Sequence, residues 1–269
     1  MAKFSTKKLG QQIEKWKSGY TGYNENASKS MSNSSFWLGS DFLEDKAAGV
    51  DFVKLAGYKR AIANFVRIVT GKDDISVNYS SGRQSYTDGK TVVISSKLDE
   101  KEFDSTVGLA LHEGSHIALT DFKRLKKLLT NTDNIPYENL LAKYSGQKGA
   151  PVKMSILKDL INIIEDRRID AYIYKSAPGY QGYYQALYDK YFNDKAIDAA
   201  LKLGLKSDPT IENYLFHICN FTNANRRLSA LPGLRDIWNT INIKNISRLK
   251  TADDVNEVAC AVYLSLIHI

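Results

Sequence analysis

The chain has 269 residues, of which 37 are basic and 30 are acidic, and 43% of its residues are hydrophobic. This length and composition are typical of a globular protein with one or two domains, and they exclude a wholly disordered or collagen-like chain. The formal charge of +7 is mild and indicates a lysine-rich surface rather than a nucleic-acid-binding face. The sequence contains no run of 18 apolar residues and no apolar leader, so we expect a cytoplasmic protein without a membrane-spanning helix. It contains only two cysteines, so we expect no disulfide framework.

The first 100 residues change from polar to periodic. Residues 18–40 are rich in Ser, Asn and Gly, and we interpret residues 1–49 as a polar arm or lid. An apolar period of about 3.6 residues predicts a helix from about Asp51 to Gly71. Two strands are expected at 75–79 and 91–95, separated by a polar connector that ends in a turn sequence.

The rest of the chain reads as mainly helical. A helix is predicted to start at Asp99, with Glu102 as its capping-box partner, and to run to about Thr120. Further helices are expected near 122–130, over 153–175 with one apolar stripe, and over most of 180–266, with breaks at 207–209 and 231–233. The sequence therefore predicts the α+β class: mainly helical, with a small sheet against the helix 99–120.

Residues 112–116 of that helix read His-Glu-Gly-Ser-His, an H-E-x-x-H pattern. Residues four apart share one face of a helix, so His112 and His116 can bind one ion. Zn²⁺ favours imidazole ligands, and Glu113, rotated by about 100° around the axis, is placed to act as a general base. Because the chain has four histidines in all, two of them in this spacing inside a predicted helix favour a zinc site over a surface histidine pair.

A catalytic zinc site needs a third protein ligand. In the helix 153–175, Glu165 and Asp166 follow an apolar run and precede Arg167 and Arg168. We predict Glu165 as the third ligand; Asp166 is the competing ligand, or a group that orients a histidine. The simpler interpretation of this run is a salt-bridged, solvated helix face, with the two arginines in surface pairs.

These motifs resemble the zincin metallopeptidases with a glutamate third ligand. The closest resemblance is to phage and bacterial metallopeptidases in which a zincin-like part accompanies a von Willebrand factor A-like domain. It rests on residues 86–95, 109–117 and 162–170 and covers about residues 50–180. It implies a zinc peptidase acting on a polypeptide, with Thr91, Val92, Val93, Ile94 and Ser95 as an edge strand that pairs with extended substrate.

Several features depart from those families. No third histidine follows at the metzincin spacing, and no D-x-S-x-S motif of a von Willebrand factor A domain occurs in the sequence. The oxyanion donor is not evident, although Tyr172 lies seven residues after Glu165 and so on the same helix face. His217 lies in an apolar stretch with Cys219 two residues on, and we interpret it as a core histidine rather than a ligand.

We therefore expect three regions: the arm at 1–49, a zincin-like core at 50–180, and a helical C-terminal portion at 181–269. The last portion stops inside an apolar run whose final residues, LSLIHI, match a translated sequencing adapter, so we expect a truncated chain in which a von Willebrand factor A-like domain is either absent or cut off. The predicted activity is zinc-dependent hydrolysis of peptide bonds. Two alternatives stay open: a non-catalytic metal- or protein-binding module, for example beside an ATPase partner, and a basic nucleic-acid-associated protein.

Overall fold

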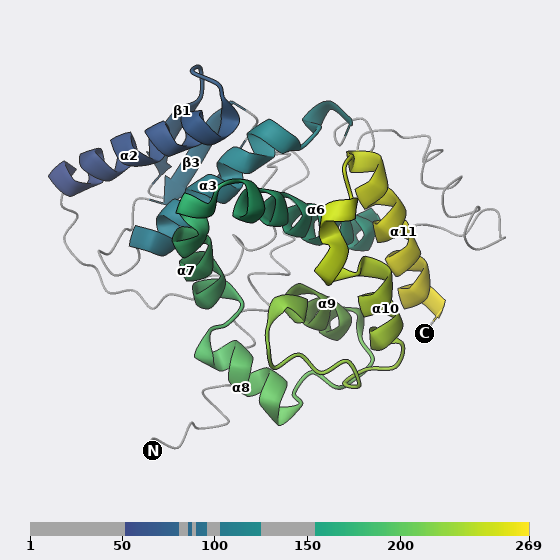
Figure 1. Ribbon diagram of the computed structural model, residues 1–269. Coiled ribbons are helices and arrows are strands. Elements are labelled where there is room, and N and C mark those ends of the chain that lie inside the picture. The colour runs from purple at the N-terminus through teal and green to yellow at the C-terminus, as the bar shows by residue number, and fades with distance from the viewer. Residues whose placement is uncertain (1–51, 81–85, 88–89, 96–102, 125–153, 269) are drawn as a thin grey trace, which may run out of the picture. The chain divides into compact units, whose positions relative to one another are not determined.

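The computed structural model describes residues 52–80, 86–87, 90–95, 103–124 and 154–268. These residues are mostly helical with one small sheet, which confirms the α+β class (Figure 1). The arm predicted at 1–49, the capping pair Asp99 and Glu102, most of the helix predicted at 122–130 and the loop predicted at 143–151 lie outside them.

The described residues form two compact units, each built from two stretches of chain. The first unit comprises Met1–Leu119 and Ile173–Ile197, and the second comprises Thr120–Tyr172 and Asp198–Ile269. The predicted boundary at residue 180 does not coincide with this division. Residues 173–197, which the sequence divided between the core and the C-terminal portion, all belong to the first unit.

The first unit contains the predicted helix and strands close to their expected positions. Helix α2 (Phe52–Thr70) ends at Gly71, whose φ of 64° reverses the chain. Strands β1 (Ser76–Ser80), β2 (Tyr86–Thr87) and β3 (Thr91–Ser95) form a sheet in the order β1-β3-β2. The sequence did not predict β2, which has two residues and lies within the polar connector.

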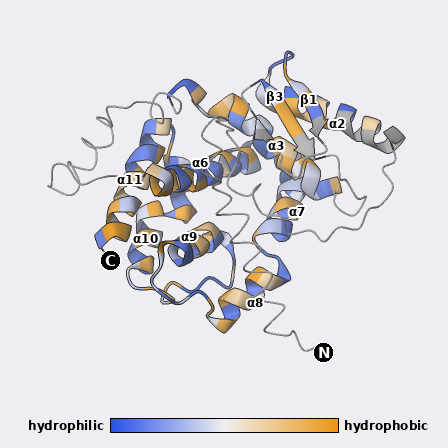
Figure 2. Ribbon diagram, turned by 180° about the vertical axis from the view of Figure 1, so that it is seen from behind, coloured by the Kyte–Doolittle hydropathy of each residue, from blue (hydrophilic) through white to orange (hydrophobic). Residues whose placement is uncertain are grey.

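The position of β3 corrects one prediction. Strand β3 is central: all five of its residues pair with β1 in parallel, and Val92 and Val93 also pair with β2 in antiparallel. It is therefore not an edge strand along Val92 and Val93, because β2 occupies the side that substrate was expected to use. Its apolar composition, orange in Figure 2, agrees with this central position, since Val92 is fully buried.

Helix α3 (Phe103–Leu119) carries the H-E-x-x-H pattern and is the most buried element of the first unit. It packs against α2, β2, β3 and α7 (Gln181–Tyr191), and every residue from 105 to 117 is buried. A contiguous apolar core joins these elements and also contains Ile173, from the last turns of α6. The sheet thus lies against the helix with the motif, as the sequence predicts.

The second unit is helical. It contains most of α6 (Met154–Ser176) and α8 (Lys195–Leu203), together with α9 (Ile211–Cys219), α10 (Leu234–Ile241) and α11 (Ala252–His268). The predicted breaks fall between α8 and α9 and before α10. Among the described residues, no helix has the length and apolar character needed to cross a membrane.

Helix α6 differs from its predicted single stripe. Every residue from 163 to 170 is buried, including five charged ones, and hydrophilic and apolar residues alternate along it in Figure 2. The predicted alternative of a solvated acidic and basic face is thus wrong for this helix. Buried charges need partners, so the contacts of these side chains decide what the helix does.

Candidate metal centre

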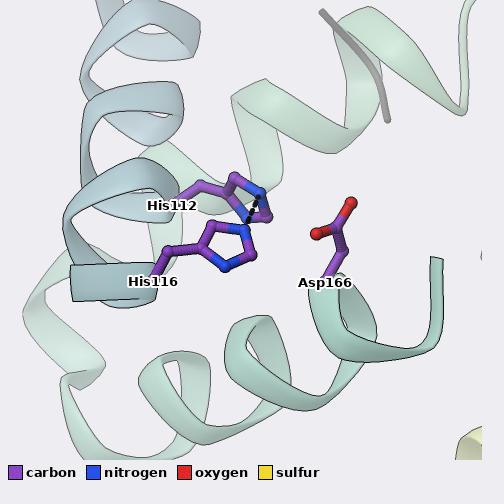
Figure 3. A group of neighbouring side chains, drawn as sticks. All are labelled: His112, His116 and Asp166. Atoms are coloured by element: carbon purple, nitrogen blue, oxygen red, sulfur yellow. Dashed lines mark hydrogen bonds between the residues drawn. The ribbon is translucent and has the colours of Figure 1, made fainter. Parts of the chain in front are cut away.

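His112 and His116 lie one turn apart on α3 and face each other. They are 0% and 8% exposed, and their Nε2 atoms are 3.2 Å apart. The two rings stand almost perpendicular, with an interplanar angle of 89° (Figure 3). The spacing of the motif on a helix predicts this convergence, and the structure brings both imidazoles together.

Small residues in the motif allow α3 to be enclosed on its other sides. A Cβ on Gly114 would lie 3.2 Å from the methyl groups of Val66 on α2. The Ser115 hydroxyl donates to the carbonyl of Leu111 at 2.6 Å and lies 3.3 Å from the Tyr184 hydroxyl on α7. Gly114 and Ser115 therefore fit the packed side of α3, which leaves the histidines on another face.

Asp166 completes a group of three potential ligands with the two histidines. One ligand atom from each of His112, His116 and Asp166 lies within 4.8 Å of the others, and all three residues are buried (Figure 3).

The donor chemistry of this group fits a transition metal. Two imidazole nitrogens and a carboxylate oxygen are ligands that zinc accepts, and tetrahedral ligands about 2.0–2.1 Å from the ion lie about 3.3 Å apart. The separation of the two Nε2 atoms agrees with that spacing. Glu113 Oε2 and Asp166 Oδ1 are buried and accept no hydrogen bond from the described residues, although both side chains have other interactions in the protein.

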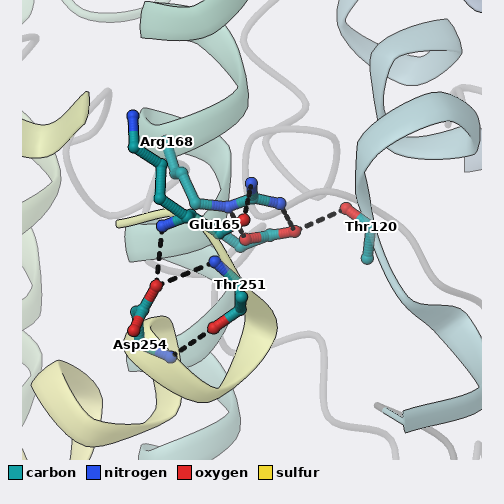
Figure 4. Close-up of polar contacts among 6 residues, drawn as sticks. Thr120, Glu165, Arg168, Thr251 and Asp254 are labelled. Atoms are coloured by element: carbon teal, nitrogen blue, oxygen red, sulfur yellow. Dashed lines mark hydrogen bonds and ion pairs between the residues drawn. The ribbon is translucent and has the colours of Figure 1, made fainter. Parts of the chain in front are cut away.

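Glu165, the predicted third ligand, does not belong to this group. Its carboxylate accepts hydrogen bonds from Arg168 Nε at 2.7 Å, from a terminal nitrogen of Arg168 at 2.7 Å and from Thr120 Oγ1 at 2.6 Å (Figure 4). The structure thus groups the alternative, Asp166, with the histidines. Adjacent residues on a helix point about 100° apart, so one of these two carboxylates faces the histidines and the other faces Arg168 and Thr120.

Glu113 is fully buried on α3 beside His112. It does not belong to the group formed by His112, His116 and Asp166, and its role as a general base stays a prediction. Tyr172 on α6 is 55% exposed, and the structure gives no observation that makes it an oxyanion donor.

The arginines after Glu165 are buried and paired rather than on the surface. Arg167 donates to the carbonyl of Cys219 at 3.0 Å and lies 3.7 Å from Asp170, while Arg168 binds Glu165. Sequence reasoning missed Thr120, because nothing in the sequence indicates that a threonine 45 residues away donates to Glu165.

His217 is a core histidine, as the sequence predicts. It is 3% exposed, and its Nε2 lies 3.1 Å from the carbonyl oxygen of Lys206. Burial lowers the pKa of His217, which favours a neutral ring whose Nε2–H donates to that carbonyl. Cys219 and Cys260 are buried and form no disulfide, and burial raises the pKa of both thiols, so neither is set up as a nucleophile.

No protein-family model, curated protein or solved structure matches this chain.

Proposed function

We propose that this protein is a zinc-dependent metallopeptidase whose ion is held by His112, His116 and Asp166. The observation that carries the proposal is the convergence of three buried ligand atoms within 4.8 Å, two from an H-E-x-x-H helix and one from α6. The resemblance to zincins supports the reaction class. The helix with the motif lying against a small sheet that contains β3 also agrees with such a domain.

Each residue has a defined task in this proposal. The two imidazoles and the Asp166 carboxylate, which are all buried, would bind the ion and leave one coordination position for water. When bound, zinc supplies Lewis acidity, which lowers the pKa of a coordinated water and polarises a scissile carbonyl. The Glu113 carboxylate accepts a proton and returns it to the nitrogen of the leaving amine.

The substrate class in this proposal is an extended polypeptide. Strand β2 covers one side of β3 at Val92 and Val93. The proposed mode of substrate binding therefore does not include backbone pairing between the substrate and these two residues. Two buried cysteines without a disulfide agree with action in the cytoplasm, where thiols stay reduced.

Metal analysis of the purified protein tests the ligand set. We expect about one zinc per chain in the wild type, measured by mass spectrometry after dialysis. In His116→Ala and Asp166→Ala the bound zinc is expected to fall at least tenfold, since each loses a ligand. His268→Ala removes an exposed histidine of α11 and serves as the matched control, which keeps its zinc.

The alternatives give different results in the same experiment. A wild type that binds no zinc even after zinc is added contradicts the proposal. Zinc retained in Asp166→Ala but lost in Glu165→Ala returns the third ligand to Glu165. Zinc bound as expected, with no peptide-bond hydrolysis, leaves a non-catalytic metal-binding module.

A further inference from the structure

Glu165, Arg168 and Thr120 form a buried polar cluster in the second unit. Arg168 contacts both carboxylate oxygens of Glu165, each at 2.7 Å, and Thr120 adds a hydrogen bond of 2.6 Å to Oε1. The side chains of Glu165 and Arg168 are each 8% exposed. Paired, charge-assisted hydrogen bonds of this geometry hold both groups in one orientation.

The members of this cluster adjoin the proposed ligands in the sequence. Glu165 directly precedes Asp166 on α6, and Thr120 follows His116 by four residues, just after α3 ends at Leu119. The hydrogen bond from Thr120 to Glu165 therefore holds, within the second unit, the turn of α6 that carries Asp166.

Arg168 extends the cluster to the start of α11. One of its terminal nitrogens lies 3.4 Å from the carbonyl of Lys250. The Asp254 carboxylate accepts hydrogen bonds from the backbone nitrogens of Lys250 and Thr251, at 2.7 and 2.9 Å (Figure 4). These bonds fix the backbone of residues 250 and 251, which includes the carbonyl that Arg168 contacts. Arg168 is thus held on two sides, which limits the positions open to the Glu165 carboxylate.

From these contacts we infer that Glu165 is a positioning residue, which with Arg168 and Thr120 fixes the orientation of the turn of α6 that carries Asp166 and thereby the affinity for the metal. The inference rests on the proposed function. Groups that orient ligands in this way change metal affinity about 10- to 100-fold when removed, without changing which atoms bind the ion.

Titration of the metal-free protein with zinc tests this inference. Thr120→Val removes the hydroxyl and keeps the shape, and we expect its zinc affinity to fall about tenfold; Thr120→Ser restores the hydroxyl and is expected to stay within about twofold of the wild type. Glu165→Gln weakens the pairing with Arg168 and is expected to lower the affinity by a similar or larger factor.

Two further variants separate positioning from folding. The double variant Glu165→Met/Arg168→Met removes the whole ion pair and leaves no buried charge unpaired, so it is expected to fold and to bind zinc weakly. Arg124→Ala breaks an ion pair with Asp253 in the same unit, where the side chains are 41% and 66% exposed, and its affinity is expected to match the wild type. Thermal unfolding of each metal-free variant identifies those that fail to fold.

The visible absorption of the cobalt-loaded proteins reports the ligand set. Weakened binding with an unchanged cobalt spectrum in Glu165→Gln supports positioning. Wild-type affinity in Thr120→Val and in the double variant overturns the inference and leaves the proposed metal site intact. A changed cobalt spectrum in Glu165→Gln, together with zinc retained in Asp166→Asn, would mean that Glu165 itself binds the metal, and this result overturns the inference. A wild type that binds neither metal overturns both the inference and the proposed function.

Discussion

Glu113 is the residue on which the proposed chemistry depends most directly. Glu113→Gln keeps the size and burial of the side chain but removes the carboxylate that accepts a proton. We expect this variant to bind zinc like the wild type and to lose about 100-fold or more of its activity, because general-base catalysis contributes about that factor. Release of fluorescent peptides from labelled, unfolded casein, with zinc content measured in parallel, checks this.

The matched control for that experiment is Glu212→Gln, which changes an exposed glutamate in the first turn of α9. It is expected to leave both zinc content and activity unchanged. Full activity in Glu113→Gln would remove Glu113 from the reaction while leaving the metal site in place.

Asp159 on α6 makes the stability of the protein depend on pH. Burial raises its pKa from 3.8 to about 6, and the nearby charge of Lys158 opposes this shift. Between these two pH values the folded chain holds a proton that the unfolded chain has released. The contribution of Asp159 to stability is therefore largest below pH 4 and is lost as the pH rises through about 6.

Asp159→Asn removes this titration. At pH 7.5 we expect its free energy of unfolding to exceed that of the wild type by about 2–3 kcal/mol, since the pKa is raised by about two units and one unit corresponds to about 1.4 kcal/mol. At pH 4 the two proteins are expected to be equally stable. Urea unfolding with a chelator present measures both values, and an equal difference at the two pH values would contradict the assignment.

At the scale of elements, the packing of α3 is set by two glycines with different surroundings. A Cβ on Gly108 would lie 2.3 Å from the backbone oxygen of Tyr183, whereas one on Gly114 would meet only side-chain atoms of Val66, at 3.2 Å. Backbone atoms cannot yield without moving α7 away from α3. We expect Gly108→Ala to destabilise the protein by about 2–3 kcal/mol, as overpacking does.

Gly114→Ala is the internal comparison for that substitution. Its contact can relax by a small shift of Val66, and alanine favours a helix over glycine by about 1 kcal/mol, so the two effects nearly cancel. Denaturant unfolding of the two variants should give clearly different midpoints. Equal midpoints would show that α7 adjusts to a side chain at residue 108.

Most elements could be predicted from the sequence, because each depends on local periodicity and turn chemistry. Helices α2, α3 and α6 begin or end within a few residues of the predicted positions where the structure describes them. The pairing of β3 on both sides could not be predicted, since β2 is only two residues long. The choice between Glu165 and Asp166 depends on which face of α6 meets the histidines, and one sequence does not fix that face.

At the scale of the whole molecule, both units are discontinuous in sequence. The chain passes from one unit to the other after Leu119, after Tyr172 and after Ile197. A fragment of residues 50–180, the core predicted from sequence, contains α3 but not α7, so the side of α3 that includes Gly108 loses its cover. We expect this fragment to expose apolar surface and to unfold without a cooperative transition, as measured by dye binding and thermal melting.

A fragment of residues 50–269 is the control, because it keeps both units complete over the described residues. It is expected to melt cooperatively near the temperature of the full chain. A cooperative transition in the shorter fragment would mean that α3, α2 and the sheet are stable without α7.

The interleaving of the two units also sets an order of events during translation. Helix α3 leaves the ribosome well before α7, which must be synthesised before α3 can be covered, and Arg168 contacts a carbonyl at Lys250 that emerges later still. Chains generally fold as their units are completed. The nascent chain therefore acquires its histidine helix early, but the surroundings of Glu165 and Arg168 on α6 are completed only after Lys250 has been synthesised.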